Sequence, residues 1–185
     1  MQLRNSEHGY GLVAVTLHWL VAITVFAMFG LGLYMVDLDY YDPWYTDAPD
    51  LHRSAGVLLF VLVILRLLWR LVNQRPAPLA GHRQFERVAA VVVHGFLYLD
   101  LFIVMVSGYL ISTADGRGIE VFGLFEVPAL LAAEKGREEL AGLVHWYAAL
   151  ALVAMAGVHA AAALKHHFVD RDQTLMRMLK VTPPK

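Results

Sequence analysis

The stretch LVHWYAALALVAMAGVHAAAALKHHF, residues 143–168, decides how the rest of this sequence is interpreted. It belongs to an apolar run at residues 140–168 that is long enough to cross a bilayer, because a spanning helix needs about 20 mostly apolar residues. Two histidines, His145 and His159, lie inside that run. Ionisable side chains within a membrane are costly and usually functional, so the stretch indicates a site as well as a span.

His145 and His159 lie on one face of the predicted helix. They are 14 residues apart, which is about 21 Å along a helix axis at 1.5 Å per residue. At about 100° per residue, 14 steps return to within about 40° of the starting direction. The two imidazoles are therefore expected to point the same way, one near each membrane surface.

Three further apolar runs, at residues 12–36, 52–71 and 88–112, also have the length of a spanning helix. The runs are continuous rather than alternating, which predicts helices and not a β-barrel. Apolar residues make up 58% of the chain and charged residues 17%, against about 45–50% and about 25% in soluble domains. The first run has no A-x-A cleavage motif, so we expect it to be retained. The sequence predicts an all-α, integral membrane four-helix bundle that forms a single domain over residues 1–185.

The charges between the runs predict the orientation. The loop at 37–51 has five acidic residues and no basic one, and the loop at 113–139 has six acidic and three basic residues. Positive charge gathers at the other ends of the runs: Arg66, Arg70, Arg75, Arg83, Arg87, Lys165, Arg171, Arg177, Lys180 and Lys185. Because positive charge near span ends marks the cytoplasmic side, both termini are predicted to be cytoplasmic. In the loop at 113–139, the apolar stretches Val121–Phe125 and Val127–Ala133 are expected to form a short helix on the membrane surface.

The chain has no cysteine and a formal net charge of −1. Without cysteine there are no disulfides, no Cys-ligated zinc or iron–sulfur clusters, and no covalent c-type haem. Without a bulk basic character, nothing points to nucleic acid as a partner.

Each histidine of the last span needs a partner at a matching depth. His18 lies about six residues into the first span, on the predicted cytoplasmic side, and His52 opens the second span on the outer side. This pairs His145 with His52, and His159 with His18. Two facing imidazoles across a helix bundle form a good axial pair for one haem iron. Two such pairs would form an electron path between the two faces of the membrane.

Other interpretations of these histidines stay open at this point. Membrane histidines also form hydrogen bonds between helices, and they serve in proton relays because they titrate near neutral pH. A non-haem metal site is disfavoured, because the pairs are too far apart and no carboxylates cluster with them.

Two arginines are candidates for binding haem propionates. Arg66 follows His52 by 14 residues, so it shares that face at the cytoplasmic depth, where a propionate would need a cation or donor. The alternative is a positive-inside arginine that snorkels to the interface, as Arg70 would. Arg53, and with it Arg117, is a candidate for the same role at the outer haem.

Several motifs resemble the prokaryotic cytochrome b561 family of four-helix di-haem membrane cytochromes. They are VTLHWL around His18, LHRSAGV at His52, RLLWRL after it, HGFLY in the third span, FGL before the fourth, and LVHWYAALA through VHAAAALKHHF to DQTLMRM. By motif, the family's ligands fall on His18, His52, His145 and His159, the set that the spacing selects. The resemblance implies two non-covalent haem b groups and a multi-pass protein of the bacterial inner membrane. A related layout occurs in cytochrome b subunits of hydrogenases and formate dehydrogenases, so the fold alone does not determine function.

Two polar residues of the third span need an interpretation. His94 lies near the depth of His18 and His159 and is the main competing ligand, although a hydrogen bond behind a ligand is favoured. Asp100 lies near the middle of the span, where a carboxylate is expensive. It is either protonated and bonded to a neighbouring helix or used in proton uptake.

The remaining histidines lie near the ends of the spans. His166, on nearly the same face as the inner ligand of the last span, is the first candidate to donate to a quinone head group, and Lys165 is the second. The alternative for His166 and His167 is a solvated interfacial pair. His8 and His82 are expected to be solvated.

The family resemblance implies electron transfer between an outer donor and the quinone pool, with ubiquinone or another quinone as acceptor. The family includes superoxide:ubiquinone oxidoreductases, so superoxide is a candidate donor, and membrane lipid and quinone are expected partners. The acidic outer loops would repel superoxide and attract a cationic protein such as a soluble cytochrome c, unless Arg53 and Arg117 form a local positive funnel. The alternative is therefore a non-catalytic electron-transfer subunit or shuttle, and a third is a haem-free bundle. No catalytic residue is assigned.

Overall fold

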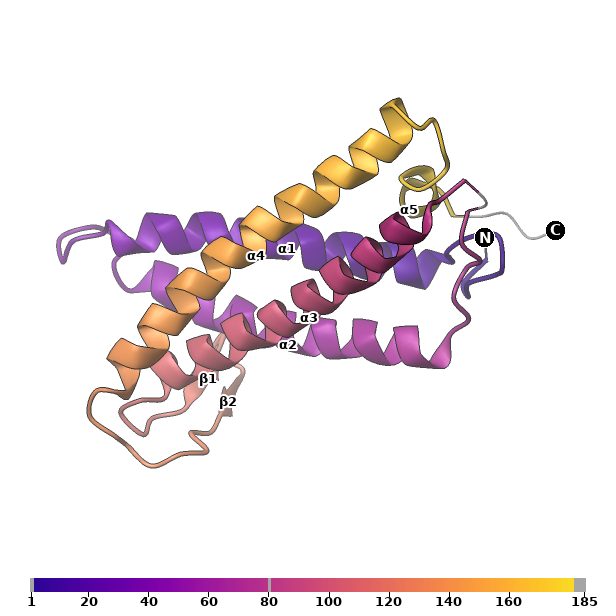
Figure 1. Cartoon of the computed structure of the whole chain (residues 1–185). Helices are drawn as coiled ribbons and strands as arrows, with labels where there is room; N and C mark the ends of the chain where they lie inside the picture. The colour runs from indigo at the N-terminus through magenta and orange to yellow at the C-terminus, as the bar shows by residue number, and fades with distance from the viewer. Residues whose placement is uncertain (1, 80, 182–185) are drawn as a thin grey trace. The chain divides into compact units, whose positions relative to one another are not determined.

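The computed structural model describes residues 2–79 and 81–181. Four long helices dominate it (Figure 1): α1 (Leu12–Val36), α2 (Asp47–Val72), α3 (Gln84–Ser112) and α4 (Arg137–Phe168). Each is long and apolar enough to cross a membrane. The prediction of four membrane-spanning helices is confirmed, and three of the helices begin three to five residues earlier than expected.

Acidic residues in the first turns help to explain why α2 and α4 begin earlier than the apolar runs. The first turn of α2 contains Asp47 and Asp50, and acidic side chains stabilise the positive end of the helix dipole. Pro49 is tolerated there, because the first turn of a helix does not need its N–H groups. In α4, two glutamates follow Arg137 in the first turn, and one lysine and two histidines occupy the last turn.

The loop between α3 and α4 contains a β-hairpin, so the expectation of a surface helix over Val121–Phe125 and Val127–Ala133 is wrong. Strand β1 (Ile119–Val121) pairs antiparallel with β2 (Phe125–Val127). Phe122 and Gly123 have φ values of 49° and 68°, and positive φ at both central residues makes a type I′ turn. The twist of this turn matches a hairpin, which explains why the apolar residues here form strands.

The chain divides into two compact units. The basic unit comprises residues 1–22, 62–97 and 154–185 and has eleven basic and four acidic residues. The acidic unit comprises residues 23–61 and 98–153 and has four basic and twelve acidic residues. Every long helix contributes residues to both units.

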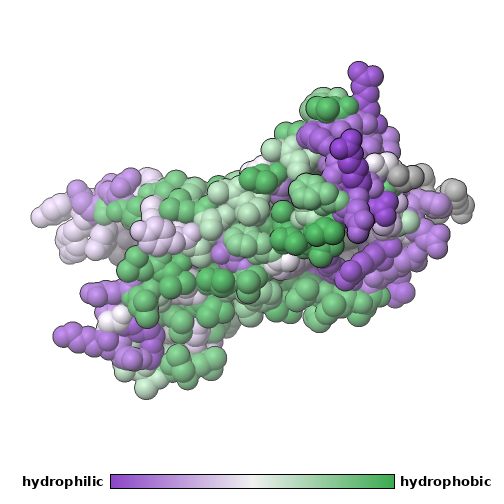
Figure 2. All heavy atoms as spheres, viewed as in Figure 1, coloured by the Kyte–Doolittle hydropathy of each residue, from purple (hydrophilic) through white to green (hydrophobic). Residues whose placement is uncertain are grey.

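Apolar side chains face outward along the helices. Val91 of α3 is 73% exposed, and Leu71 of α2 is 67% exposed. Figure 2 shows that hydrophobic residues form most of the visible helix surface. A soluble protein would not leave so much apolar surface in water, so these faces are suited to lipid.

Hydrogen bonds tie the chain ends into the basic unit. The Asn5 side chain donates to the carbonyl of Gln74 over 2.9 Å. Trp19 Nε1 of α1 donates to the carbonyl of Met178 over 2.7 Å, in the short helix α5 (Met176–Leu179). These bonds hold both terminal segments against the ends of the long helices.

Ser54 tethers the hairpin to α2 within the acidic unit. Its side chain is nearly fully buried. Its hydroxyl donates to the carbonyl of Glu120 over 3.3 Å and accepts from the backbone N–H of Phe122 over 3.1 Å. The Tyr109 hydroxyl of α3 holds the next part of the loop, because it donates to the Pro128 carbonyl over 2.9 Å and accepts from the Leu130 N–H.

Candidate haem-binding sites

In the acidic unit, His52 of α2 faces His145 of α4. The ring centres lie 6.1 Å apart, with the ring planes at 74°. Small residues make room for both rings: a Cβ atom on Gly32 would lie 3.5 Å from His52 Cε1, and one on Gly108 only 3.0 Å from His145 Cε1. The absence of a side chain at Gly108 of α3 therefore allows the His145 ring to approach this helix closely.

Hydrogen bonds orient the ring of His145. Its Nδ1 lies 2.8 Å from the carbonyl of Val104 and 3.3 Å from the hydroxyl of Ser107. Since a carbonyl only accepts, Nδ1 carries the proton, and Nε2 is left as a free base. This is the usual arrangement of a histidine that ligates a metal. By contrast, His52 Nδ1 is buried without a hydrogen-bond partner among residues 2–79 and 81–181.

Both rings line a cavity of about 2000 Å³ that lies wholly within the acidic unit. Ligand pockets for drug-sized molecules are usually about 300–1,000 Å³, so this cavity is large enough for a flat macrocycle. Its walls are largely apolar, with Phe29, Leu59 and Leu152 among them. Such a lining suits the apolar faces of a flat macrocycle.

In the basic unit, His18 of α1 faces His159 of α4. Their ring centres are 6.3 Å apart, with the planes at 80°. His94 of α3 lies closer to His159, with 5.0 Å between ring centres, and its Nδ1 lies 2.6 Å from the carbonyl of Ala90. The charge of Arg66 acts on all three imidazoles, so this arginine lies near the inner site.

The ring separations distinguish an intervening iron from a direct hydrogen bond. A ligating nitrogen lies about 2.0–2.1 Å from the metal and about 1.1 Å from the centre of its own ring. The ring centres of two imidazoles on opposite sides of one metal ion are therefore about 6.3 Å apart. A direct hydrogen bond of about 2.9 Å would bring the ring centres to about 5.1 Å. The pairs at 6.1 and 6.3 Å fit haem iron between two nitrogens. The 5.0 Å between the ring centres of His94 and His159 is too short for two ligands on opposite sides of one haem iron.

The two arginines near the outer site have acidic partners. Arg53 pairs with Asp50, one turn away on α2, and Arg117 Nε donates to Asp115 Oδ2 over 2.6 Å. Hydrogen bonds from Arg117 hold the pKa of Asp115 below its usual value, and the same carboxylate raises the pKa of Arg117. The positive charge of each arginine is therefore offset, which weakens the predicted positive funnel.

His82 is not solvated, contrary to the expectation from the sequence. Its side chain is 19% exposed, and its Nε2 lies 3.0 Å from Asp172 Oδ2 and 3.2 Å from the Thr174 hydroxyl. His166, with 14% exposure, lies 2.8 Å from the same Asp172 oxygen. Sequence reasoning missed this cluster because 90 residues separate His82 from Asp172. The only available signal was the position of Asp172 in the DQTLMRM motif.

Comparisons with known proteins match nearly the whole chain. The family model described as prokaryotic cytochrome b561 matches residues 9–180. Cytochrome b561 homolog 2 of Escherichia coli (strain K12) is 48% identical over 179 residues, covering 97% of this chain and 95% of that protein. A probable superoxide oxidase CybB of Yersinia pestis is 30% identical over 175 residues, covering 92% and 95%. A cytochrome b562 of Cereibacter sphaeroides is 29% identical over 182 residues, covering 95% and 98%.

Proposed function

This chain belongs to the prokaryotic cytochrome b561 family, and from that premise we propose that it binds two haem b groups and transfers electrons across the bacterial inner membrane. The donor would lie on the outer face, and the acceptor would be the quinone pool. The observation that carries the proposal is the pair of histidine ring separations, 6.1 Å in the acidic unit and 6.3 Å in the basic unit. Each unit would hold one haem.

The chain's own residues would hold and tune these groups. When bound, haem iron supplies reversible one-electron chemistry whose potential depends on its axial ligands and surroundings. His52 and His145 would be the outer ligands, and His18 and His159 the inner ones. The Val104 carbonyl orients His145 and increases its basicity. Arg66 and Arg53 are the candidates to neutralise propionates.

His166 and Lys165 remain the candidates for binding a quinone head group near the inner haem. Both lie in the last turn of α4, in the unit that contains His18 and His159. His166 Nδ1 faces two carboxylates, Asp170 and Asp172, so its Nε2, on the other side of the ring, is the nitrogen that would meet a quinone head group. A His166→Ala variant should lower quinone reduction while leaving both haems in place.

The charge of the acidic unit favours a second candidate for the donor. Superoxide is an anion, and the negatively charged surface of a unit with twelve acidic and four basic residues would slow its approach. The same surface would attract a cationic electron-transfer protein, such as a soluble cytochrome c. The support for superoxide is the name of the Yersinia pestis relative, and the support for a cationic protein is this charge distribution.

The haem-to-protein ratio of the detergent-purified protein, with oxidised and dithionite-reduced spectra, tests the proposal. We expect two b-type haems per chain. His52→Leu and His18→Leu should each leave about one haem, and the matched variant His8→Leu, outside both pairs, should keep two. A well-folded but colourless protein would contradict the proposal, as would full haem content in both ligand variants.

A further inference from the structure

Three segments that are distant in sequence converge on one small polar cluster in the basic unit. His82 precedes α3, His166 lies in the last turn of α4, and Asp172 follows that helix. We call these three residues the inner cluster. One ligand atom from each lies within 4.8 Å of the others, and all three side chains are half-buried.

The cluster has the donor types and spacing of a metal site. Asp172 Oδ2 lies 3.0 Å from His82 Nε2 and 2.8 Å from His166 Nδ1. Ligands about 2.0–2.1 Å from a tetrahedral ion lie about 3.3–3.4 Å from one another. An ion would therefore need Asp172 Oδ2 to move away from each imidazole nitrogen by about half an ångström or less, with the two nitrogens already within 4.8 Å of each other.

A backbone hydrogen bond orients the carboxylate of Asp172. Asp172 Oδ1 accepts from the backbone N–H of Thr174 over 2.7 Å, which leaves Oδ2 for the two imidazoles. Oδ2 thus faces His82 Nε2 at 3.0 Å and His166 Nδ1 at 2.8 Å. Ligating carboxylates are typically held by such outer hydrogen bonds, which strengthen metal binding.

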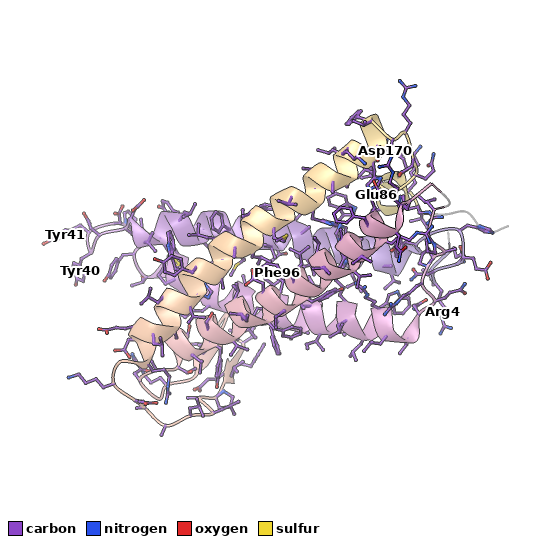
Figure 3. All side chains as sticks on the ribbon, viewed as in Figure 1. Arg4, Tyr40, Tyr41, Glu86, Phe96 and Asp170 are labelled. Atoms are coloured by element: carbon purple, nitrogen blue, oxygen red, sulfur yellow. The ribbon has the colours of Figure 1, made fainter. Side chains whose placement is uncertain are left out.

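The charges around the inner cluster also favour a cation. Asp170 Oδ2 lies 3.0 Å from His166 Nδ1. Lys165, a nearby positive charge, is paired with Asp170 at 2.6 Å and with Glu86 at 3.0 Å. Figure 3 labels these two carboxylates, which lie near each other where α3 begins and α4 ends.

We propose that the inner cluster binds one divalent transition-metal ion of the zinc class through His82 Nε2, His166 Nδ1 and Asp172 Oδ2, with water in the fourth position. The ion would fasten the segment after α4 to the segment before α3. It would also lie directly behind the His166 ring, whose other nitrogen is the candidate quinone donor. The site itself does not depend on the two haems.

Calorimetric titration with Zn²⁺ tests the site. The protein carries both haems, has no histidine tag and is first stripped with EDTA. We expect one site per chain. His82→Asn and Asp172→Asn should each weaken binding by at least about tenfold, because removing even an outer partner of a ligand typically costs 10–100-fold. His167→Asn is the matched control, because this adjacent histidine contacts Phe168 and is not one of the three proposed ligands. It should bind zinc as the original protein does.

Haem content and thermal stability make each outcome decisive. Zinc should raise the Tm of the original protein and of His167→Asn, but not that of His82→Asn, with two haems retained throughout. No saturable zinc binding would overturn the proposal, and so would equal affinity in all three variants. Loss of haem with zinc binding intact would instead count against the proposed cytochrome function.

Discussion

Adding one methyl group at Gly108 should weaken haem binding in the acidic unit. A Cβ atom there would lie 3.0 Å from His145 Cε1 and 3.2 Å from its Nδ1, closer than ordinary contact, so the imidazole must move by a few tenths of an ångström. The movement pulls Nδ1 away from the Val104 carbonyl, now at 2.8 Å. A hydrogen bond of this kind contributes about 0.5–1.5 kcal/mol. We therefore expect Gly108→Ala to release the outer haem about 2–12-fold faster, at about 1.4 kcal/mol per tenfold.

Two other glycines provide matched controls. A Cβ atom at Gly32 would lie 3.5 Å from His52 Cε1, an ordinary contact, and one at Gly30 would meet nothing within 4 Å. All three substitutions also favour helix formation by up to about 1 kcal/mol, so Gly30→Ala should stabilise the protein without changing haem binding. Gly32→Ala should have a small effect or none.

Haem transfer to excess apomyoglobin gives the release rate directly. Low-temperature EPR of the ferric protein reports whether the imidazole pair of the acidic unit has moved. The reasoning is refuted if Gly108→Ala releases haem at the rate of Gly30→Ala with an unchanged EPR spectrum. It is also refuted if the disturbed signal belongs to the haem bound by His18 and His159.

Three further predictions concern the hairpin, the inner cluster and the donor. Ser54→Ala should remove the tether between α2 and the hairpin and lower the free energy of unfolding by about 1–2 kcal/mol, because two backbone groups lose a buried partner. Proteolysis within residues 113–136 should become faster, and Ser112→Ala is the control. In EDTA, Asp172 should stabilise the protein above its unfolded pKa of 3.8 and lose this effect as the pH falls toward the folded value of about 2. The difference in Tm between the original protein and Asp172→Asn should therefore shrink as the pH falls from 3.8 to about 2. A constant difference would contradict this prediction. If a basic cytochrome is the donor, its rate of electron exchange should fall steeply between low salt and 0.15 M salt, and a salt-insensitive rate would count against electrostatic docking.

The separation of charge along the chain gives a physical basis for its orientation. The basic unit has eleven basic residues and the acidic unit twelve acidic ones, and an excess of lysine and arginine favours the cytoplasmic side. We therefore infer that the basic unit and both chain termini face the cytoplasm. Protease protection of a terminal epitope in right-side-out vesicles would test this orientation.

The hairpin shows where pattern reasoning failed. The alternation of Ile119, Glu120 and Val121 over three residues is too short to outweigh an apolar run. The turn depends on a positive φ at Phe122, a conformation that bulky residues rarely adopt. The hydroxyl of Ser54 supports it from a residue 68 positions away, and no local pattern reports such a contact.

The amino-acid sequence by itself determined the four helices and the spacing of their histidines. Continuous apolar runs must satisfy their backbone hydrogen bonds internally, and helical periodicity then places His145 and His159 on one face. Only the tertiary structure decided the distances of 6.1 and 6.3 Å between the rings of the predicted pairs, and that His94 lies too close to His159 for the two to be axial ligands of one haem. It also decided that His82 meets Asp172. Local propensity acts between neighbours in sequence, whereas a binding site depends on distances between atoms that packing alone brings together.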